Sequence, residues 1–282
     1  MKPVFLLQNN AYDRIGRLIA PCLDYCRENG AEFIDRSLTA EFDPDLLDVD
    51  TSSGVLVYGS VGWVRKFKSS ARFGSWISYD GDAFATSAWT EHFGDRALNY
   101  GGQIETLERV TALLSAGAVL HVRPDRDDKA FNGGVYDRES WSGEVTRRRS
   151  EKGADLPSDL RCWVSSPAEI GAEARCWFVG GELVSGSLYR RDGQRLIQRL
   201  EEGPLMEAAS VFADVHLPCR DIVMDVAETP GGIKLLEFNP IHSSGWYAGD
   251  VTRILDAWCR QLVYVASMGD RPCPPLQPGE AP

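Results

Sequence analysis

Short apolar runs alternate with a helical pattern over the first 75 residues. Residues 4–8 and 55–58 are almost wholly apolar, which is typical of strands buried on both faces of a parallel sheet. Residues 13–29 place apolar side chains at helical spacing and end at Asn29-Gly30, a common helix stop. With a further short strand at 31–34, this order predicts a small parallel α/β unit.

The pattern changes twice further along the chain. Residues 81–116 are predicted to be mainly helical, and from Val119 short strands are separated by glycine turns. Gly180-Gly181 and residues 230–232 are the turns of two predicted hairpins. A final helix is expected over 251–267. The strands are expected at 119–122, 162–164, 174–179, 183–189, 221–227 and 233–239.

The last of these hairpins carries a candidate metal site. Glu237 and Asn239 project from the same face of one strand, because side chains alternate along a strand. If the loop 230–232 has an odd number of residues, Asp225 of the neighbouring strand lies on that face too. Carboxylate-rich oxygen sites suit magnesium. The alternative is the polar face of an edge hairpin, and spacing alone leaves both interpretations open.

A second glycine-containing segment, Gly59-Ser60-Val61-Gly62, follows an apolar strand and suggests a phosphate-binding loop. It lacks the full glycine fingerprint of such loops. We therefore favour a tight turn from strand to helix.

The formal net charge of -11 and the pI of about 4.9 argue against binding along a nucleic-acid backbone. A small anion remains possible where cations gather. A basic cluster usually forms a solvated face. Of the four clusters in this chain, only the one at 123–129 is expected to bind an anion, for reasons given below. The four clusters are Arg65/Lys66/Lys68/Arg72, Arg123/Arg126/Lys129, Arg147/Arg148/Arg149 and Arg190/Arg191/Arg195/Arg199.

No run approaches the roughly 20 apolar residues of a membrane helix, and the opening apolar run 4–7 is short for a signal peptide. The seven cysteines form no CxxC pair. We expect a cytoplasmic protein with reduced cysteines. The proline-rich tail, residues 268–282, is expected to be disordered.

Three segments together resemble the ATP-grasp superfamily, and within it a small divergent clade named for one arginine and two lysines. The first two are HVRPDRDDKAFNGGVY at 121–136 and SSPAEIGAEARCWFVGGELVSGSLY at 165–189. The third, VMDVAETPGGIKLLEFNPIHSSGWY at 224–247, contains the run EFNP after an aspartate on the preceding strand. They occur in the family's order and cover most of residues 119–267.

The resemblance implies an α/β fold with α+β lobes: a small N-terminal pre-ATP-grasp domain at 1–75 and a two-lobed ATP-grasp domain at 76–267. It also implies ATP and magnesium as cofactors. Asp225, Glu237 and Asn239 would be the metal ligands. The ATP-binding residues would be Arg123 and Lys129 at the phosphates, Gly133 and Gly134 in a covering loop, Trp163, Val164, Ser165 and Ser166 at the adenine, and Arg175.

Glu173 and Arg175 resemble the family's E-x-R pair, and with Arg123 they form the expected catalytic set. His242, Ser243 and Ser244 follow the metal ligands and could face the acceptor. Many ATP-grasp proteins have lysine where this chain has Arg123. The second phosphate-binding lysine is not located, and Lys66, Lys68 and Lys234 are its candidates.

The implied reaction joins a small-molecule or peptide carboxylate to an amine through an acyl phosphate. The alternatives are a nucleotidyl- or phosphotransferase with the same nucleotide site, and a non-catalytic nucleotide-binding module. No GxSxG run suggests a nucleophilic serine. Nucleic-acid and membrane partners are not expected.

Overall fold

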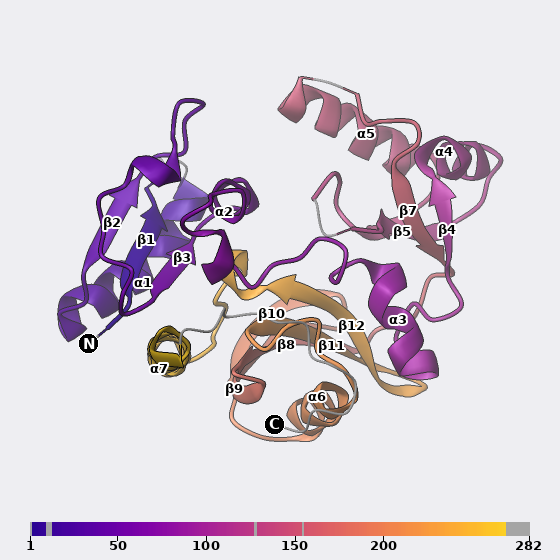
Figure 1. Ribbon diagram of the computed structural model, residues 1–282. Coiled ribbons are helices and arrows are strands. Elements are labelled where there is room, and N and C mark those ends of the chain that lie inside the picture. Colours follow the sequence, from indigo (N-terminus) through magenta and orange to yellow (C-terminus); the bar gives the residue numbers. More distant parts are fainter. Residues whose placement is uncertain (1, 10–12, 127–128, 154, 269–282) are drawn as a thin grey trace.

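The computed structural model describes residues 2–9, 13–126, 129–153 and 155–268. Its strands form three sheets, coloured indigo, magenta and orange in Figure 1. The chain completes each sheet before it begins the next, so every sheet consists of consecutive strands. Helices and sheets are mixed as the sequence predicted.

The first sheet is parallel, with the strand order β2-β1-β3. β1 and β3 are apolar except for Gln8 at the end of β1, as expected for strands covered on both faces. Phe5 and Leu56 belong to a core shared with α1 and α7, whereas Leu6 and Val57 belong to a core shared with α2. The elements are β1 Val4–Gln8, α1 Asp13–Asn29, β2 Phe33–Arg36, β3 Val55–Tyr58 and α2 Val61–Lys68, with 3-10 turns at Pro44–Leu46 and Gly74–Trp76.

The second sheet is antiparallel, with the order β4-β7-β5-β6. Its inner face buries Val122, Cys162 and Val164 under α4 and α5. The opposite face carries Arg123 and Trp163, which are cross-strand partners. The elements are α3 Thr86–Phe93, a 3-10 turn at Gly94–Arg96, β4 Gln103–Thr106, α4 Leu107–Ser115, β5 Leu120–Pro124, β6 Gly134–Tyr136, α5 Arg138–Lys152 and β7 Arg161–Ser165.

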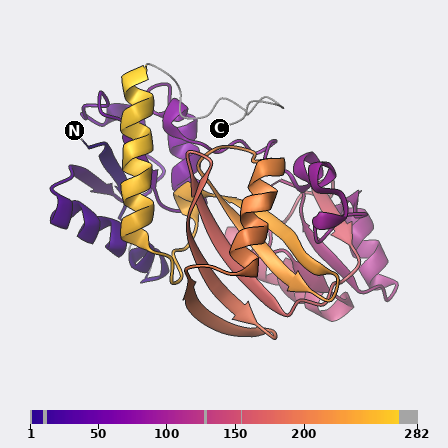
Figure 2. The same ribbon diagram turned by 90° about the horizontal axis from the view of Figure 1, so that it is seen from below.

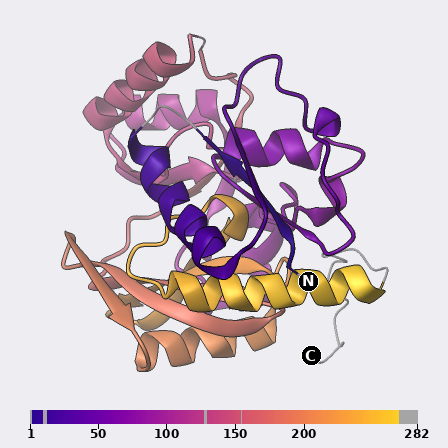
Figure 3. The same ribbon diagram turned by 90° about the vertical axis from the view of Figure 1, so that its left-hand side faces the viewer.

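The third sheet is antiparallel, with the order β10-β9-β8-β11-β12. α6 lies across one face, as Figure 2 shows. α7 contacts β8 and β9 as well as α1 and β3, so it joins the first sheet to the third (Figure 3). The elements are β8 Ala172–Val179, β9 Glu182–Arg191, β10 Gln194–Leu200, α6 Pro204–Val215, β11 Ile222–Thr229, β12 Gly232–Pro240, a 3-10 turn at Ile241–Ser243 and α7 Val251–Met268.

The sequence predicted most of these elements, and the parallel first sheet is confirmed. The segment after β3 is the favoured strand-to-helix turn: Ser60 caps α2 by accepting a hydrogen bond from the Trp63 amide. Residues 81–116 are less helical than predicted, because β4 lies within them. α5, β6, β10 and α6 were not predicted. The tail expected from residue 268 lies outside the described residues, except Met268, which still belongs to α7.

Candidate functional site

The hairpin of β11 and β12 brings Asp225, Glu237 and Asn239 together. Asn239 Nδ2 donates to Asp225 Oδ2 over 3.3 Å and to Glu237 Oε1 over 2.9 Å. The predicted convergence on one face is therefore present, but its cause differs. The turn has two residues, because Thr229 pairs with Gly232, and a bulge at Leu236 shifts the register so that Asp225 faces Glu237.

Three cations from separate segments contact this hairpin. Arg175 of β8 binds Asp225 through two parallel hydrogen bonds, Nε to Oδ1 and Nη2 to Oδ2, each 2.8 Å. Arg123 of β5 reaches Glu237 Oε2 over 2.8 Å from the second sheet. Lys129 Nζ donates to Asn239 Oδ1 over 3.2 Å. We call these five charged side chains and Asn239 the ionic cluster.

The ionic cluster runs from a buried end to an exposed one: Asp225, Arg175 and Asn239 are buried, Arg123 and Glu237 are half-buried, and Lys129 is exposed. Burial and the neighbouring charges together set the protonation of its carboxylates. Burial raises the pKa of Asp225 to about 6, although Arg175 opposes this shift. Burial would raise the pKa of Glu237 as well, but Arg123 and Lys129 lower it to about 2. Burial disfavours the Arg175 cation, yet Asp225 raises its pKa. Three cations against two carboxylates leave one net positive charge at the centre of an acidic protein.

The donors of the ionic cluster fit magnesium. Two carboxylates and one amide on paired strands supply hard oxygen ligands, and magnesium needs few protein ligands when phosphates and water complete its shell. Among the residues that the structure describes, no group of three or more His, Cys, Asp or Glu side chains offers a competing metal site.

Glu173 lies two residues before Arg175 on β8 but takes no part in the ionic cluster. Its carboxylate accepts hydrogen bonds from Tyr189 Oη, over 2.7 Å, and from Arg190, over 2.9 Å. Glu173 and Arg175 therefore do not pair with each other. Tyr189 stacks on Tyr247, with ring centroids 5.1 Å apart, and the guanidinium of Arg175 lies 5.0 Å from the Tyr247 ring.

Tyr247 belongs to the loop between β12 and α7 and has a φ of 45°. A left-handed backbone is unfavourable for a bulky residue and is often found at functional sites. The loop holds this conformation through the neighbouring amide, since Ala248 N donates to Ser187 Oγ. The sequence did not single out Tyr189 or Tyr247, although their stacked rings lie beside the Arg175 guanidinium.

The predicted adenine segment lies on β7, where alternation along the strand sends its side chains to opposite faces of the sheet. Val164 is buried in the core beneath α4 and α5, whereas Trp163 lies on the opposite face and donates Nε1 to Asn99 O. Ser165 Oγ contacts Asn99 Oδ1 and His121 Nδ1. Ser166 is exposed just past the strand. Asn99 and His121 were missed, although His121 precedes Arg123 by two residues and so shares its strand face.

The predicted covering loop is short and approaches β5 closely. A side chain at Gly133 would place its Cβ 3.1 Å from Arg123 Cβ. Glycine thus permits the contact between the loop and the strand that carries Arg123. Gly134 already begins β6, the edge strand of the second sheet.

His242 does not face the ionic cluster, so its expected contact with the acceptor is wrong. The ring is 1% exposed, Nδ1 lies 2.8 Å from Val57 O, and Nε2 accepts from Ser78 N over 3.0 Å. Ser244 is also buried and donates to Pro240 O. These residues fasten the first sheet to the end of β12.

The candidate second lysines lie elsewhere too. Lys68 Nζ donates to Ile77 O, and Lys234 Nζ donates to Asp95 O. Lys66 is exposed on α2. None of the three contacts the ionic cluster in the part of the chain that the structure describes.

Burial of His242 predicts a specific loss of stability in acid. Burial, with a contribution from Lys68, lowers the pKa of this imidazole from 6.5 to about 4. The unfolded chain then takes up a proton on this imidazole near pH 6.5, whereas the folded chain does so only near pH 4. The free energy of unfolding therefore falls as the pH drops from 6.5 to 4. The change corresponds to roughly 3 kcal/mol in free energy of unfolding.

We expect His242→Gln to lack this component. Urea unfolding of both proteins at about pH 7.5, 5.5 and 4 measures it, because only the difference in pH dependence is compared. Parallel curves for the two proteins would show that His242 is not a buried neutral histidine.

The second sheet, covered by α4 and α5, and the larger third sheet meet at the ionic cluster through Arg123 and Glu237. The chain belongs to the ATP-grasp domain family called R2K clade family 3, whose model matches residues 59–262. This confirms the resemblance drawn from the sequence. No curated protein matches the chain.

Solved structures agree on the fold. D-alanine–D-alanine ligase from Bacillus anthracis, complexed with ATP, superposes with a TM-score of 0.63 at 13% identity, over 95% of this chain and 100% of that one. D-cycloserine synthetase DcsG gives 0.57 at 14% identity, over 92% and 99%. A RimK domain ATP-grasp protein from Sphaerobacter thermophilus gives 0.57 at 14% identity, over 91% and 99%. No helix among the described residues is long and apolar enough to cross a membrane.

Proposed function

We propose that this protein is an ATP- and magnesium-dependent ligase that joins a carboxylate to an amine through an acyl phosphate. The observation that carries the proposal is the ionic cluster, where the buried Asp225 and the half-buried Glu237 lie beside three cations with one positive charge in excess. A polyphosphate bound to a divalent cation complements such a site. The named ATP-grasp neighbours include a ligase complexed with ATP, which supports the nucleotide.

Each part of the cluster has a proposed role. Asp225, Glu237 and Asn239 hold magnesium, which neutralises charge on the bridging phosphates when it is bound. Arg123 and Lys129 bind phosphate oxygens, and Gly133 and Gly134 allow the loop backbone to approach them. The residues at 163–166 border the adenine. Of these, Ser165 and Ser166 offer polar groups, whereas Val164 contributes only its backbone.

Arg175 and Glu173 serve the reacting groups in this proposal. The substrate carboxylate oxygen attacks the γ-phosphorus of ATP, the bond to the β-phosphate oxygen breaks, and ADP leaves. The amine nitrogen then attacks the acyl carbon, loses a proton, and expels phosphate. Arg175 stabilises the negative charge that builds up on the transferred phosphoryl group. Glu173 accepts a hydrogen bond from Tyr189 and so positions the Tyr189 ring beside Arg175.

The first substrates to try are acidic amino acids and peptides, because the excess positive charge favours a second carboxylate. We also retain as proposals the division into domains at 1–75 and 76–267 and a cytoplasmic location. A nucleotidyl- or phosphotransferase remains the alternative reaction. A non-catalytic nucleotide-binding module is less well supported, since all three proposed metal ligands are present and in contact.

The nucleotide product tests the proposal. With ATP, magnesium, a carboxylate and an amine, we expect ADP and phosphate to appear in step with an amide. Chromatography of the nucleotides and mass spectrometry of the product measure both. AMP and pyrophosphate would point to adenylyl transfer, whereas ATP binding without turnover over a broad substrate panel would favour the binding module.

A further inference from the structure

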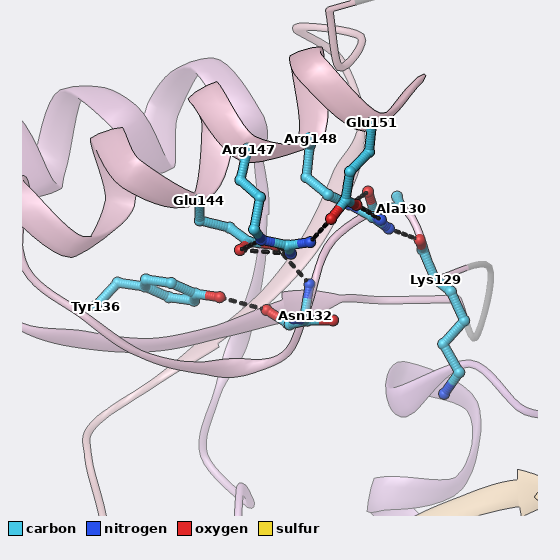
Figure 4. Close-up of polar contacts among 8 residues, drawn as sticks. All are labelled: Lys129, Ala130, Asn132, Tyr136, Glu144, Arg147, Arg148 and Glu151. Atoms are coloured by element: carbon cyan, nitrogen blue, oxygen red, sulfur yellow. Dashed lines mark hydrogen bonds and ion pairs between the residues drawn. The ribbon is translucent and has the colours of Figure 1, made fainter. Parts of the chain in front are cut away.

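One face of α5 lies over the segment that carries Lys129. Four charged side chains on this face are spaced three and four residues apart, which places them in one row of the helix. Figure 4 shows the row turned toward residues 129–132. The row consists of Glu144, Arg147, Arg148 and Glu151.

Two of these side chains hold the loop by its backbone. Arg148 donates Nε to Ala130 O over 2.6 Å and Nη2 to Lys129 O. Glu144 Oε1 accepts a hydrogen bond from Asn132 N over 3.0 Å. The Asn132 carbonyl is held as well, because it accepts from Tyr136 Oη over 2.6 Å.

Both side chains are buried, at 8% exposure for Arg148 and 9% for Glu144. Buried charges are costly unless they are paired, and here ion pairs continue through the row. Arg147 contacts Glu144 and Glu151, and Arg148 contacts Glu151. The basic run 147–149 is therefore not the solvated face that its composition suggested. Only its last member, Arg149, is exposed and pairs with Asp155.

The attachment includes the backbone of Lys129, whose ammonium reaches the ionic cluster. Lys129 has a φ of 53°, an unfavourable conformation that its surroundings must stabilise. Its carbonyl turns toward Arg148 and its ammonium turns away from α5, as Figure 4 shows. The ammonium lies 3.2 Å from Asn239 Oδ1 in the ionic cluster. Loss of the carbonyl contact would release the backbone at the residue whose side chain enters the site.

We propose that Arg148 and Glu144 are positioning residues that hold the 129–132 backbone so that Lys129 meets the phosphate tail of ATP. The inference rests on the proposed function, because it assigns Lys129 to the phosphates. Arginine suits the role, since its fork reaches two adjacent carbonyl groups and the single ammonium of lysine does not present the same geometry.

Titration with ATP and AMP in the presence of magnesium tests the inference. Arg148→Ala and Glu144→Ala are expected to weaken ATP binding about tenfold or more while AMP affinity changes little. Arg148→Lys is expected to restore little. Glu144→Gln is expected to restore most of the affinity, because its amide oxygen still accepts from Asn132 N. Arg149→Ala, exposed on the same helix, is the matched control and should bind both nucleotides like the wild type.

A double-mutant cycle separates positioning from general stability. If Arg148 acts through Lys129, the double variant Lys129→Ala/Arg148→Ala should bind ATP no more weakly than Lys129→Ala alone. Additive losses would overturn the inference. Hydrogen exchange gives a direct readout in the folded protein, because Glu144→Ala should speed exchange of the Asn132 amide relative to Glu144→Gln.

Failure of the proposed function and failure of the positioning role give different results. Wild-type protein that does not distinguish ATP from AMP would refute the phosphate role of Lys129 and this inference with it. Wild-type protein that prefers ATP, with the same preference kept in Arg148→Ala, would overturn the inference alone. A thermal melt of each variant identifies any protein that is not folded at the assay temperature, and Arg148→Lys and Glu144→Ala then supply the same comparison.

Discussion

Glu237→Gln is expected to remove the magnesium-dependent part of ATP binding and to lower turnover by about a hundredfold or more. The amide keeps the size of the side chain and one oxygen but loses the charge that attracts a divalent cation. Glu237 is preferable to Asp225 for this test. Asp225 is 1% exposed and bonded twice to Arg175, so its replacement leaves a buried unpaired cation.

Thermal melts with and without ATP and magnesium measure the binding effect. A ligand at a hundred times its Kd stabilises the native state by about 2.7 kcal/mol, which is a shift of about 5 °C for a chain of this size. We expect this shift in the wild type and little of it in Glu237→Gln. Glu228→Gln is the matched control, because Glu228 is exposed on the same hairpin.

The control should keep the full shift. An equal shift in Glu237→Gln and wild type, with magnesium still required, would remove Glu237 from the metal site. A variant that melts far below the wild type without ligand would instead indicate a structural role for the Arg123–Glu237 pair.

The site could be predicted from sequence where local periodicity decides the geometry. Alternation along a strand places Glu237 beside Asn239, and it also places Arg123 and Trp163 on one face of the second sheet once their pairing is known. The apolar runs of β1 and β3 identify a sheet buried on both faces. The side-by-side placement of Glu237 and Asn239 and the buried first sheet depend on residues close in sequence, and both were predicted. The shared face of Arg123 and Trp163 was not, because it depends on the pairing of β5 with β7.

Relationships between strands could not be read from the sequence because bulges set them. The two-residue turn 230–231 alone would place Asp225 opposite Leu236, and the bulge moves Glu237 into that position. In the hairpin of β8 and β9, two register shifts place Glu173 opposite Arg190 rather than Leu188. A bulge has no strong sequence signature here, so the contacts of Glu173 with Tyr189 and Arg190 could not be predicted.

The role of the charged row on α5 could not be predicted for a different reason. Its spacing of glutamate and arginine is the same in a solvent-exposed helix that is stabilised by ion pairs. Only tertiary structure shows that Arg148 lies under the loop. His242 is the opposite case, since its position after the metal ligands suggested chemistry. The chain turns there, and the ring enters the core between Val57 and Trp258.

Arg175→Ala is expected to suppress acyl-phosphate formation by about a hundredfold to a thousandfold while ATP affinity falls by about tenfold or less. Arg175 is proposed to act on charge that builds up during phosphoryl transfer, so its removal should affect the reaction more than the bound ground state. Hydroxylamine intercepts an acyl phosphate and gives a hydroxamate when the carboxylate is present without the amine. The hydroxamate yield therefore measures the first chemical step alone.

The substitution also has a structural cost that the experiment must separate from chemistry. Asp225 would keep a buried carboxylate without its two hydrogen bonds, and breaking a buried pair typically costs about 3–5 kcal/mol. Assays are therefore run well below the measured melting temperature of the variant. Arg161→Ala is the matched control, because it removes an arginine from another buried carboxylate, Asp125, which lies outside the ionic cluster.

Arg175→Lys distinguishes charge from geometry. Lysine keeps the positive charge but not the planar fork that bonds both oxygens of Asp225. If charge alone stabilises the transferred phosphoryl group, the lysine variant should recover most of the hydroxamate yield. If orientation by Asp225 is also required, recovery should be small although the melting temperature rises above that of Arg175→Ala. Equal factors of loss in hydroxamate formation and ATP affinity would contradict a specific role in phosphoryl transfer, because a residue that merely binds ATP weakens both together.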